Sequence, residues 1–226
     1  PFSVAVGARY DYISQRQFIP QALSQTNTSD HAYNASVLIG YQLNNTTRLQ
    51  GEIATGFRFP TLSERFFEGE TPRGTTKGNP TLNAEESTGV QINFITELTP
   101  NLSVELSGYY YQVDNYIERY DIDDTVTSYR NLNKADITGI ESILQWQPSQ
   151  QWHHSLRYQW QQGEDAAHNV LSDIQAPQWQ VTTQWFGNNL NVRNTLSYRQ
   201  RQTHVSTQEK PTNSFINWEL FITTTL

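Results

Sequence analysis

Apolar and polar residues alternate through ten separate stretches of this chain, and this alternation limits the folds that it can adopt. From Leu102 to Tyr111, one set of alternate residues contains leucine, valine, glycine and tyrosine, and the other contains serine, glutamate and tyrosine. Successive side chains of a β-strand point to opposite faces of a sheet, so each stretch predicts a strand with one apolar and one polar face. The predicted strands are Phe2–Ile13, Asn34–Leu43, Thr47–Arg58, Ser87–Thr96, Leu102–Gln112, Tyr129–Trp146, Trp152–Gly163, Gln178–Phe186, Leu190–Gln202 and Ser214–Thr225.

The connections between these strands alternate between short and long. The short ones are rich in turn-forming residues and are Asn44-Asn45, Leu98–Asn101, Pro148–Gln150 and Gly187–Asn189. The long ones are polar and are Ser14–Tyr33, Phe59–Glu86, Val113–Ser128, Glu164–Pro177 and Arg201–Asn213. Short turns at one end and long loops at the other are typical of a transmembrane β-barrel, with the short turns on the periplasmic side. The sequence therefore predicts an all-β, antiparallel transmembrane barrel.

Composition excludes several other classes of protein. The hydrophobic content is 36% and the mean hydropathy is -0.66, and no apolar run approaches the roughly 18 to 20 residues of a spanning helix. A barrel fits these values because only every second residue of its strands must be apolar. The chain has no cysteine, which excludes thiol chemistry and disulfides. Its net charge of -7 offers no basic surface for nucleic acid.

Two motifs resemble the barrel region of TonB-dependent outer-membrane receptors. The first is a strand end that leads into an external loop, Gly56-Phe57-Arg58-Phe59-Pro60-Thr61-Leu62-Ser63-Glu64. The second resembles the start of the next strand and is Gly78-Asn79-Pro80-Thr81-Leu82 followed by Glu85-Glu86-Ser87. Residues 7–12 and 131–141 resemble other strands of that family, so the resemblance spans nearly the whole chain.

The resemblance implies a barrel of about 22 strands around an N-terminal plug domain, with a TonB-contacting segment ahead of the plug. Since the chain has room for ten strands, we expect residues 1–226 to be a partial barrel domain that lacks the plug. The implied function is active transport across the outer membrane of a Gram-negative cell. The receptor would bind a scarce ligand, foremost a ferric siderophore, and import it with energy delivered by the TonB complex. Outer-membrane lipid and the plug of the same polypeptide are the other implied partners.

The candidate ligand-binding residues lie in or near two of the long loops. Arg58 has the inward parity of its strand, and an ion pair with Glu85 is the simpler interpretation of its role. Aromatic side chains beside cations suit an anionic chelate whose rings can stack. In the second long loop these are Arg65, Phe66, Phe67 and Arg73, and around the third loop they are Tyr109, Tyr111, Tyr116 and Tyr120. The tyrosines could equally form the outer aromatic girdle of a barrel.

Three alternatives remain open at this point: a passive porin-like channel, an omptin-like outer-membrane protease and a soluble β-sandwich. A protease would need Asp and His pairs at the outer rim, and the local candidate is His168 near Asp165 and Asp173. The histidines lack metal-ligand spacing, and no nucleophile elbow or phosphate-binding glycine motif is present. We therefore expect no enzymatic activity, no cofactor and no metal site.

Overall fold

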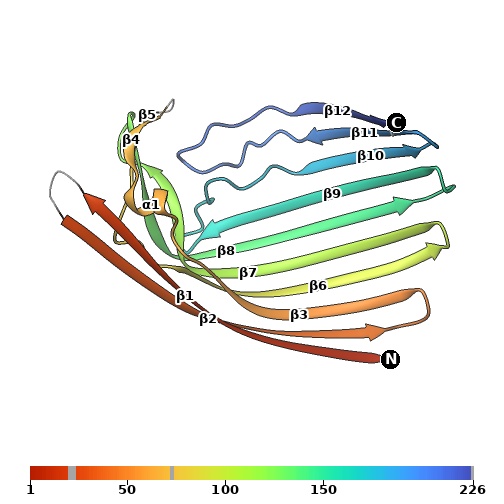
Figure 1. Ribbon diagram of the computed structural model, residues 1–226, viewed down its shortest axis with the longest axis horizontal. Helices are drawn as coiled ribbons and strands as arrows, with labels where there is room; N and C mark the ends of the chain where they lie inside the picture. Colours follow the sequence, from red (N-terminus) through yellow and green to blue (C-terminus); the bar gives the residue numbers. More distant parts are fainter. Residues whose placement is uncertain (20–23, 72–73, 225–226) are drawn as a thin grey trace.

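The computed structural model describes the chain except for residues 20–23, 72–73 and 225–226. Ten long antiparallel strands pair as neighbours in chain order and form a single sheet (Figure 1). They are β1 (Phe2–Ile19), β2 (Ser24–Gln42), β3 (Thr47–Arg58), β6 (Glu85–Thr99), β7 (Leu102–Asp121), β8 (Val126–Trp146), β9 (Trp152–Asp165), β10 (Gln178–Phe186), β11 (Leu190–Arg199) and β12 (Phe215–Thr224). The segment between β3 and β6 adds a short helix, α1 (Leu62–Phe66), and two short strands, β4 (Glu68–Thr71) and β5 (Gly74–Lys77).

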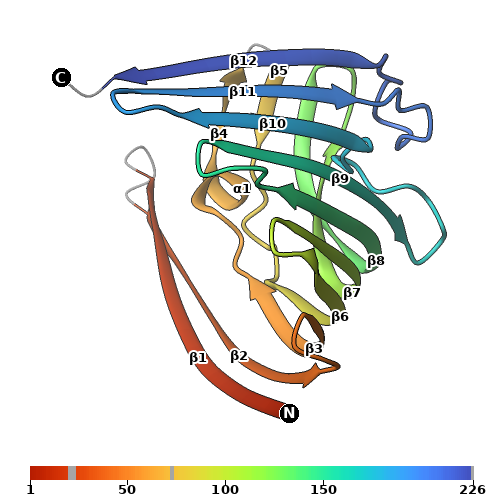
Figure 2. The same ribbon diagram turned by 90° about the vertical axis from the view of Figure 1, so that its right-hand side faces the viewer.

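The sheet curves into an open gutter (Figure 2). β1 and β12 form its two edges and are not paired with each other in the described part of the chain. The tight turns lie at the same end as both termini, and α1, β4 and β5 lie at the opposite end (Figure 1). An antiparallel sheet that curves without closing fits part of a transmembrane β-barrel, since a complete barrel has no free edge.

The outward face of the gutter carries the apolar side chains. Along β1, Val4 is 54% and Val6 is 76% exposed, and along β12, Trp218 is 64% exposed. The buried hydrophobic residues of the described chain are few: Ala32, Leu82, Val113, Ile117, Ala135, Leu171 and Ala176. No second layer covers the Trp- and Leu-bearing side, so the described chain does not form the two-sheet sandwich. No helix among the described residues is both long and apolar enough to span a membrane.

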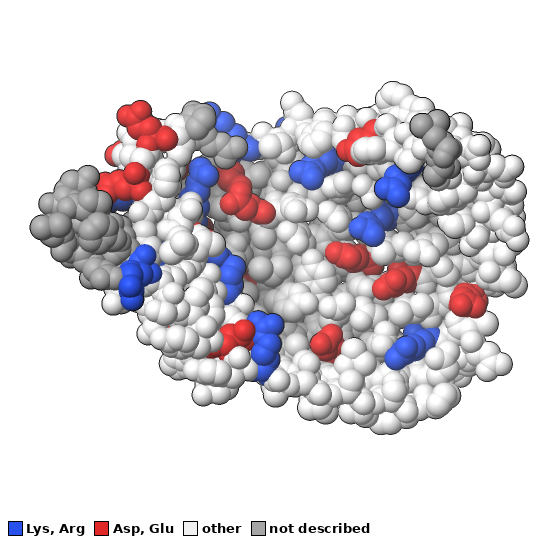
Figure 3. All heavy atoms as spheres, in the orientation of Figure 1, with Lys and Arg blue, Asp and Glu red and all other residues white. Residues whose placement is uncertain are grey.

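The concave face is polar. Figure 3 looks onto this face and shows acidic and basic side chains scattered over it among uncharged ones. Paired residues of neighbouring antiparallel strands share a face. One such row runs across five strands and contains Glu52, Gln91, Tyr109, Gly139 and Gln161. A wall of this kind suits a wide, wet interior.

The four short turns are confirmed. At the first, the backbone N–H of Leu43 donates to the Thr47 carbonyl over 2.9 Å, and the Asn44 side chain accepts from the Thr46 N–H. At the last, the N–H of Gly187 donates to the Leu190 carbonyl over 2.8 Å. Asparagine favours such turns because its side chain can accept from a nearby backbone N–H.

Two of the predicted long loops are mostly strand, so those boundaries were wrong. Residues 14–19 and 24–33 continue the β1–β2 ladder, and residues 113–121 and 126–128 continue the β7–β8 ladder, which leaves only residues 122–125 as its loop. In these outer parts buried positions are filled by polar as well as apolar side chains, such as Gln15 and Glu118, so the apolar alternation stops while the backbone hydrogen bonds continue. At the other boundaries, β6 begins at Glu85 and β11 ends at Arg199. Thr47–Arg58 and Gln178–Phe186 are confirmed as predicted.

Candidate functional site

Residues 59–84 connect β3 to β6 and pack against strands at the long-loop end of the gutter; we call this segment the strap. Figure 2 shows its helix, α1, on the concave side of the sheet. Its contacts reach β1, β2, β3 and β8. The predicted external loop is therefore a folded element attached to the inner wall.

A capping box explains why α1 forms within only five residues. The Thr61 hydroxyl accepts from the Glu64 N–H over 3.1 Å, and the Glu64 carboxylate accepts from the Thr61 N–H over 2.7 Å. These two bonds satisfy backbone donors that the first turn of a helix leaves without partners. The Thr-Leu-Ser-Glu part of the first motif is thus a helix start.

Arg58 links the strap to two strands. Its guanidinium donates to both carboxylate oxygens of Glu85, at 2.8 and 2.9 Å, and to both of Glu64, at 2.9 and 3.0 Å. Glu85 also accepts from the backbone N–H of Ile117 in β7 over 2.7 Å. The ion-pair interpretation of Arg58 is confirmed, and the pair joins β3, β6, β7 and α1. The side chain of Arg58 remains 41% exposed.

Arg65 is the most enclosed charged side chain of the described chain, at 1% exposure. It donates to both carboxylate oxygens of Asp30, at 2.7 and 3.1 Å, to the Gln15 side chain and to the carbonyl of Leu82. Gln15 in turn donates to the carbonyl of Pro60 over 2.8 Å. Because this guanidinium is buried and bonded, it holds α1 to β1 and β2, and we do not assign it a ligand contact.

The second half of the strap rests on β8. β4 and β5 form a hairpin, and β5 pairs parallel with the start of β8 through Thr75 and Val126. The Asn79 amide donates to the Tyr129 carbonyl over 3.0 Å. At Gly78, an added Cβ would lie 2.7 Å from the carbonyl carbon of Arg65, so only glycine lets the two backbones approach. The Gly-Asn-Pro part of the second motif is therefore a packing contact against α1.

At Asn115 the alternation of side chains along β7 shifts by one residue, and Tyr116 therefore points to the inward face. Asn115 has a φ of 55°, in the left-handed region that asparagine tolerates. Before it the inward residues are Tyr109, Tyr111 and Val113, and after it Tyr116 packs against the cluster of Val113, Ala135 and Leu171. Burial, followed by the charge of Glu85, raises the pKa of Tyr116 to about 12. Tyr116 therefore lies near Arg58 and Glu85, and its main role is to pack against this cluster.

Tyr109 and Tyr111 lie further down the concave wall, away from the strap. Their rings are 5.3 Å apart, and the positions that face them on neighbouring strands are the glycines Gly139 and Gly89. A Cβ at Gly89 would lie 2.1 Å from the Tyr111 ring, and one at Gly139 would lie 2.2 Å from the Tyr109 ring. The two rings therefore lie flat on the wall and offer an aromatic surface to the interior.

The remaining candidates lie apart from one another. Phe66 is half-buried in α1, and Phe67, which follows it, is 41% exposed. Tyr120 lies under the guanidinium of Arg130, 4.8 Å from the ring centre, and Arg130 is paired with Glu118. Arg73 lies outside the described residues. The structure thus places Arg58, Arg65, Phe66 and Phe67 on or beside the strap, and the four tyrosines along β7.

Sequence reasoning missed the partners that hold the strap. Asp30 and Gln15 belong to a region predicted as loop, and each lies far along the chain from Arg65. No local spacing signals a contact between residues so distant in sequence. The side chain of His168, the candidate of the protease alternative, is 88% exposed, and its Nδ1 lies 3.1 Å from the Glu164 carboxylate rather than beside the carboxylate of Asp165 or Asp173.

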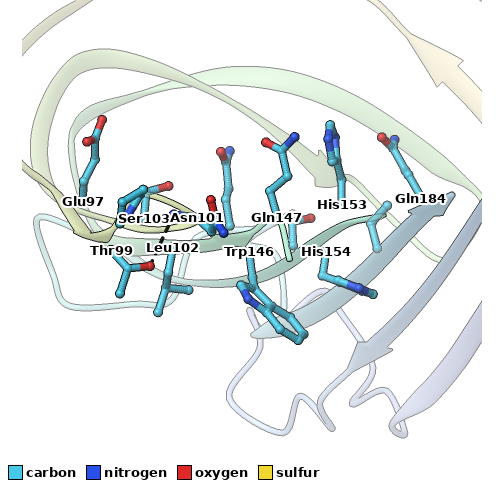
Figure 4. A pocket seen from close by; sticks show the side chains of 14 residues that line it. Glu97, Thr99, Asn101, Leu102, Ser103, Trp146, Gln147, His153, His154 and Gln184 are labelled. Atoms are coloured by element: carbon cyan, nitrogen blue, oxygen red, sulfur yellow. Dashed lines mark hydrogen bonds between the residues drawn. The ribbon is translucent and has the colours of Figure 1, made fainter. Parts of the chain in front are cut away.

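A recess of about 380 Å³ lies at the short-turn end, between the ends of β6 to β10. Figure 4 shows Glu97, Gln147, His153 and Gln184 pointing to one side of the sheet, and Trp146 and His154 pointing to the other. The inward side of this recess is lined mainly by amide and hydroxyl groups. It lies at the opposite end of the strands from the strap.

Comparisons with known proteins agree with this architecture. The family model described as TonB dependent receptor-like, beta-barrel, matches residues 1–224. The solved structure of the copper transporter OprC is similar with a TM-score of 0.77 at 16% identity, over 97% of this chain and 36% of that one. The ferric yersiniabactin uptake receptor FyuA from Yersinia pestis gives a TM-score of 0.66 at 14% identity, over 98% of this chain and 35% of that one.

A third similar structure is the R480A mutant of the ferric enterobactin receptor PfeA from Pseudomonas aeruginosa, in complex with enterobactin. It gives a TM-score of 0.63 at 16% identity, over 97% of this chain and 38% of that one. No curated protein sequence matches the chain. The chain therefore spans little more than a third of the length of these solved structures, and at such low identity the likeness concerns the fold.

Proposed function

Because this chain belongs to the family of TonB-dependent receptor β-barrels, we propose that it is part of the barrel of a receptor that binds a scarce ligand at its outer mouth and imports it. The ligand class that we propose is a ferric siderophore, and the energy source is the TonB complex. Barrels of this family lie in the outer membrane of Gram-negative cells, and we propose the same location here. The plug domain would occupy the concave side.

The main structural support for this proposal is the fixed position of the strap. Arg58 and Arg65 fix it to β1, β2, β3, β6 and β7, so the long-loop end of the wall presents a preorganised surface. Preorganised groups bind more tightly because little conformational entropy is lost when the ligand arrives. The exposed aromatic side chain at the end of α1 is Phe67, which we propose as a contact for the rings of a chelate.

Similar structures support a transported iron chelate, since their titles name receptors for ferric yersiniabactin and ferric enterobactin. Another title names a copper transporter, so the fold alone does not select the ligand. The family and these structures are receptors and transporters, and we propose binding and transport without covalent chemistry.

Uptake by the full-length receptor tests this function. A deletion strain that expresses the receptor is supplied with defined radioactive ferric siderophores, with and without an active TonB complex. We expect uptake of at least one chelate that is lost without TonB. Unchanged uptake of every chelate in the deletion strain would reject the siderophore proposal.

Variants on the same short segment test the site. Phe67→Ala removes an exposed ring, and we expect about a tenfold weaker binding of the transported chelate, the loss of one well-packed contact. Leu62→Ala, a 58% exposed apolar residue at the other end of α1, is the matched control and should change binding less than twofold. Equal effects of the two substitutions would argue against contact through Phe67.

A further inference from the structure

Three polar side chains form a row on the otherwise apolar outward face of β9, β10 and β11. His154 is paired with Thr183, and Thr183 is paired with Asn194, so all three side chains point to the same side. We call them the outward polar row. Figure 4 shows His154 pointing away from the side taken by His153, Gln147 and Gln184.

The rows on either side of the outward polar row are apolar. Towards the membrane centre the next row is Leu156, Val181 and Leu196, and towards the short turns it is Trp152, Trp185 and Val192. The row lies within four residues of the strand ends at the short turns, at Trp152, Phe186 and Leu190. Polar side chains that face lipid are least costly at this depth, where the hydrocarbon meets the headgroups.

Two hydrogen-bond donors of the outward polar row, on His154 and Asn194, are available to a ligand. Nδ1 of His154 lies 3.1 Å from the Thr183 hydroxyl. The indole N–H of Trp218 donates to the amide oxygen of Asn194, and an indole can only donate, so the Asn194 NH2 group faces elsewhere. In the described part of the chain, neither Nε2 of His154 nor the Asn194 NH2 group has a hydrogen-bond partner.

Two indole rings hold His154 in place. Its ring stacks on Trp146 with 5.1 Å between ring centres and on Trp152 with 5.8 Å, at interplanar angles of 28° and 4°. Trp146 is 48% and Trp152 is 42% exposed, so both rings also border the membrane. Because stacking already restricts the ring of His154, little conformational freedom is lost when a ligand binds. The outward polar row is therefore preorganised.

We propose that the outward polar row binds the phosphodiester headgroup of a glycerophospholipid in the leaflet at the short-turn side. Nε2–H of His154, with the Thr183 hydroxyl donating to Nδ1, and the NH2 group of Asn194 donate to phosphate oxygens. Trp146 and Trp152 border the glycerol and acyl region, as indoles do at membrane interfaces. This inference rests on the proposed membrane location and adds a lipid site to it.

Native mass spectrometry of the full-length protein in detergent tests the site, with phosphatidylglycerol as the probe. The variant that removes both donors is His154→Phe with Asn194→Leu, and we expect it to bind the lipid about tenfold more weakly, as for two lost net hydrogen bonds. His154→Gln keeps a donor and should stay within twofold of the wild type. Ser142→Ala, an outward polar residue on β8, is the matched control and should also stay within twofold.

Several outcomes would overturn the proposal. Undiminished lipid binding by the double variant, or an equal loss in Ser142→Ala, would show that the row does not hold the headgroup. Equal binding of diacylglycerol, which lacks the phosphate, would show that the headgroup does not contribute to binding. Displacement of the lipid by millimolar inorganic phosphate would point to a free-anion site instead.

Two controls separate failure of this site from failure of the membrane location. Heat-modifiable gel mobility shows whether each variant is folded. In lipid nanodiscs, brominated acyl chains should quench tryptophan fluorescence equally in the wild type and the double variant. Absence of quenching in both would overturn the membrane location, whereas quenching with unchanged lipid binding would overturn the lipid site alone.

Discussion

At the scale of single residues, Arg65 shows how an ion pair can have a structural role in a chain with a small hydrophobic core. Replacing it by methionine leaves Asp30 with an unpaired, largely enclosed charge, which costs about 3 kcal/mol or more. We expect Arg65→Met to lower the free energy of unfolding of the full-length protein by about that amount in urea titrations. The double variant Arg65→Met with Asp30→Leu should recover part of the loss, and no recovery would mean that the pair is not the cause.

The raised pKa of Tyr116 predicts how the stability of the protein changes at alkaline pH. Its pKa is raised from 10.0 to about 12 in the folded protein, so folding favours the neutral phenol. The resulting stability is fully present below pH 10 and is lost as pH rises towards 12, by about 2 to 3 kcal/mol. The difference in absorbance at 295 nm between the wild type and Tyr116→Phe should titrate near pH 12. A difference that titrates near pH 10 would show that this phenol is hydrated.

At the scale of elements, the strap depends on the close approach of Gly78 to α1. Gly78→Ala places a Cβ within 2.8 Å of backbone atoms of Arg65 and Phe66, so we expect the second half of the strap to separate from α1. Trypsin should then cut within residues 59–84 at least tenfold faster in the variant than in the wild type. Gly51→Ala is the control, because nothing lies within 4 Å of the added carbon, and equal cleavage of both variants would contradict the packing role.

The strands and the strap show how much of this structure can be predicted from the sequence. Alternation predicts β3 and β10 to the residue because each lies between one apolar and one polar environment. It does not predict the outer parts of β1, β2, β7 and β8, where polar side chains such as Gln15 and Glu118 are buried and polarity no longer marks one face. The Arg58 and Glu85 pair is predictable because paired strands bring the two residues together. The Arg65 and Asp30 contact is not, since it depends on how the strap folds back onto β2.

At the scale of the whole molecule, all six tryptophans have the outward parity of their strands: Trp146, Trp152, Trp160, Trp179, Trp185 and Trp218. An indole at an interface places its ring in lipid and its N–H near water. We expect brominated lipids to quench most of the tryptophan fluorescence of the refolded full-length protein. Aqueous iodide should quench little, and the opposite pattern would contradict the outward orientation of the apolar face.

In the proposed outer-membrane location, the outer parts of β7 and β8 would face the surroundings of the cell. From Gln112 to Asp121 the β7 strand continues for nine more residues, roughly 30 Å of extended chain. Its tip is the acidic turn at residues 122–125, closed by the Asp123 carboxylate bonded to the backbone of Thr125 and Val126. The hairpin of the strap reaches this tip, because the Thr75 N–H donates to the Thr125 carbonyl over 2.8 Å and β5 pairs with β8 from Val126 onward. In the proposed outer-membrane location, an antibody raised against intact cells would therefore meet the tip and the hairpin together, and an epitope tag inserted at residues 122–125 would loosen the strap.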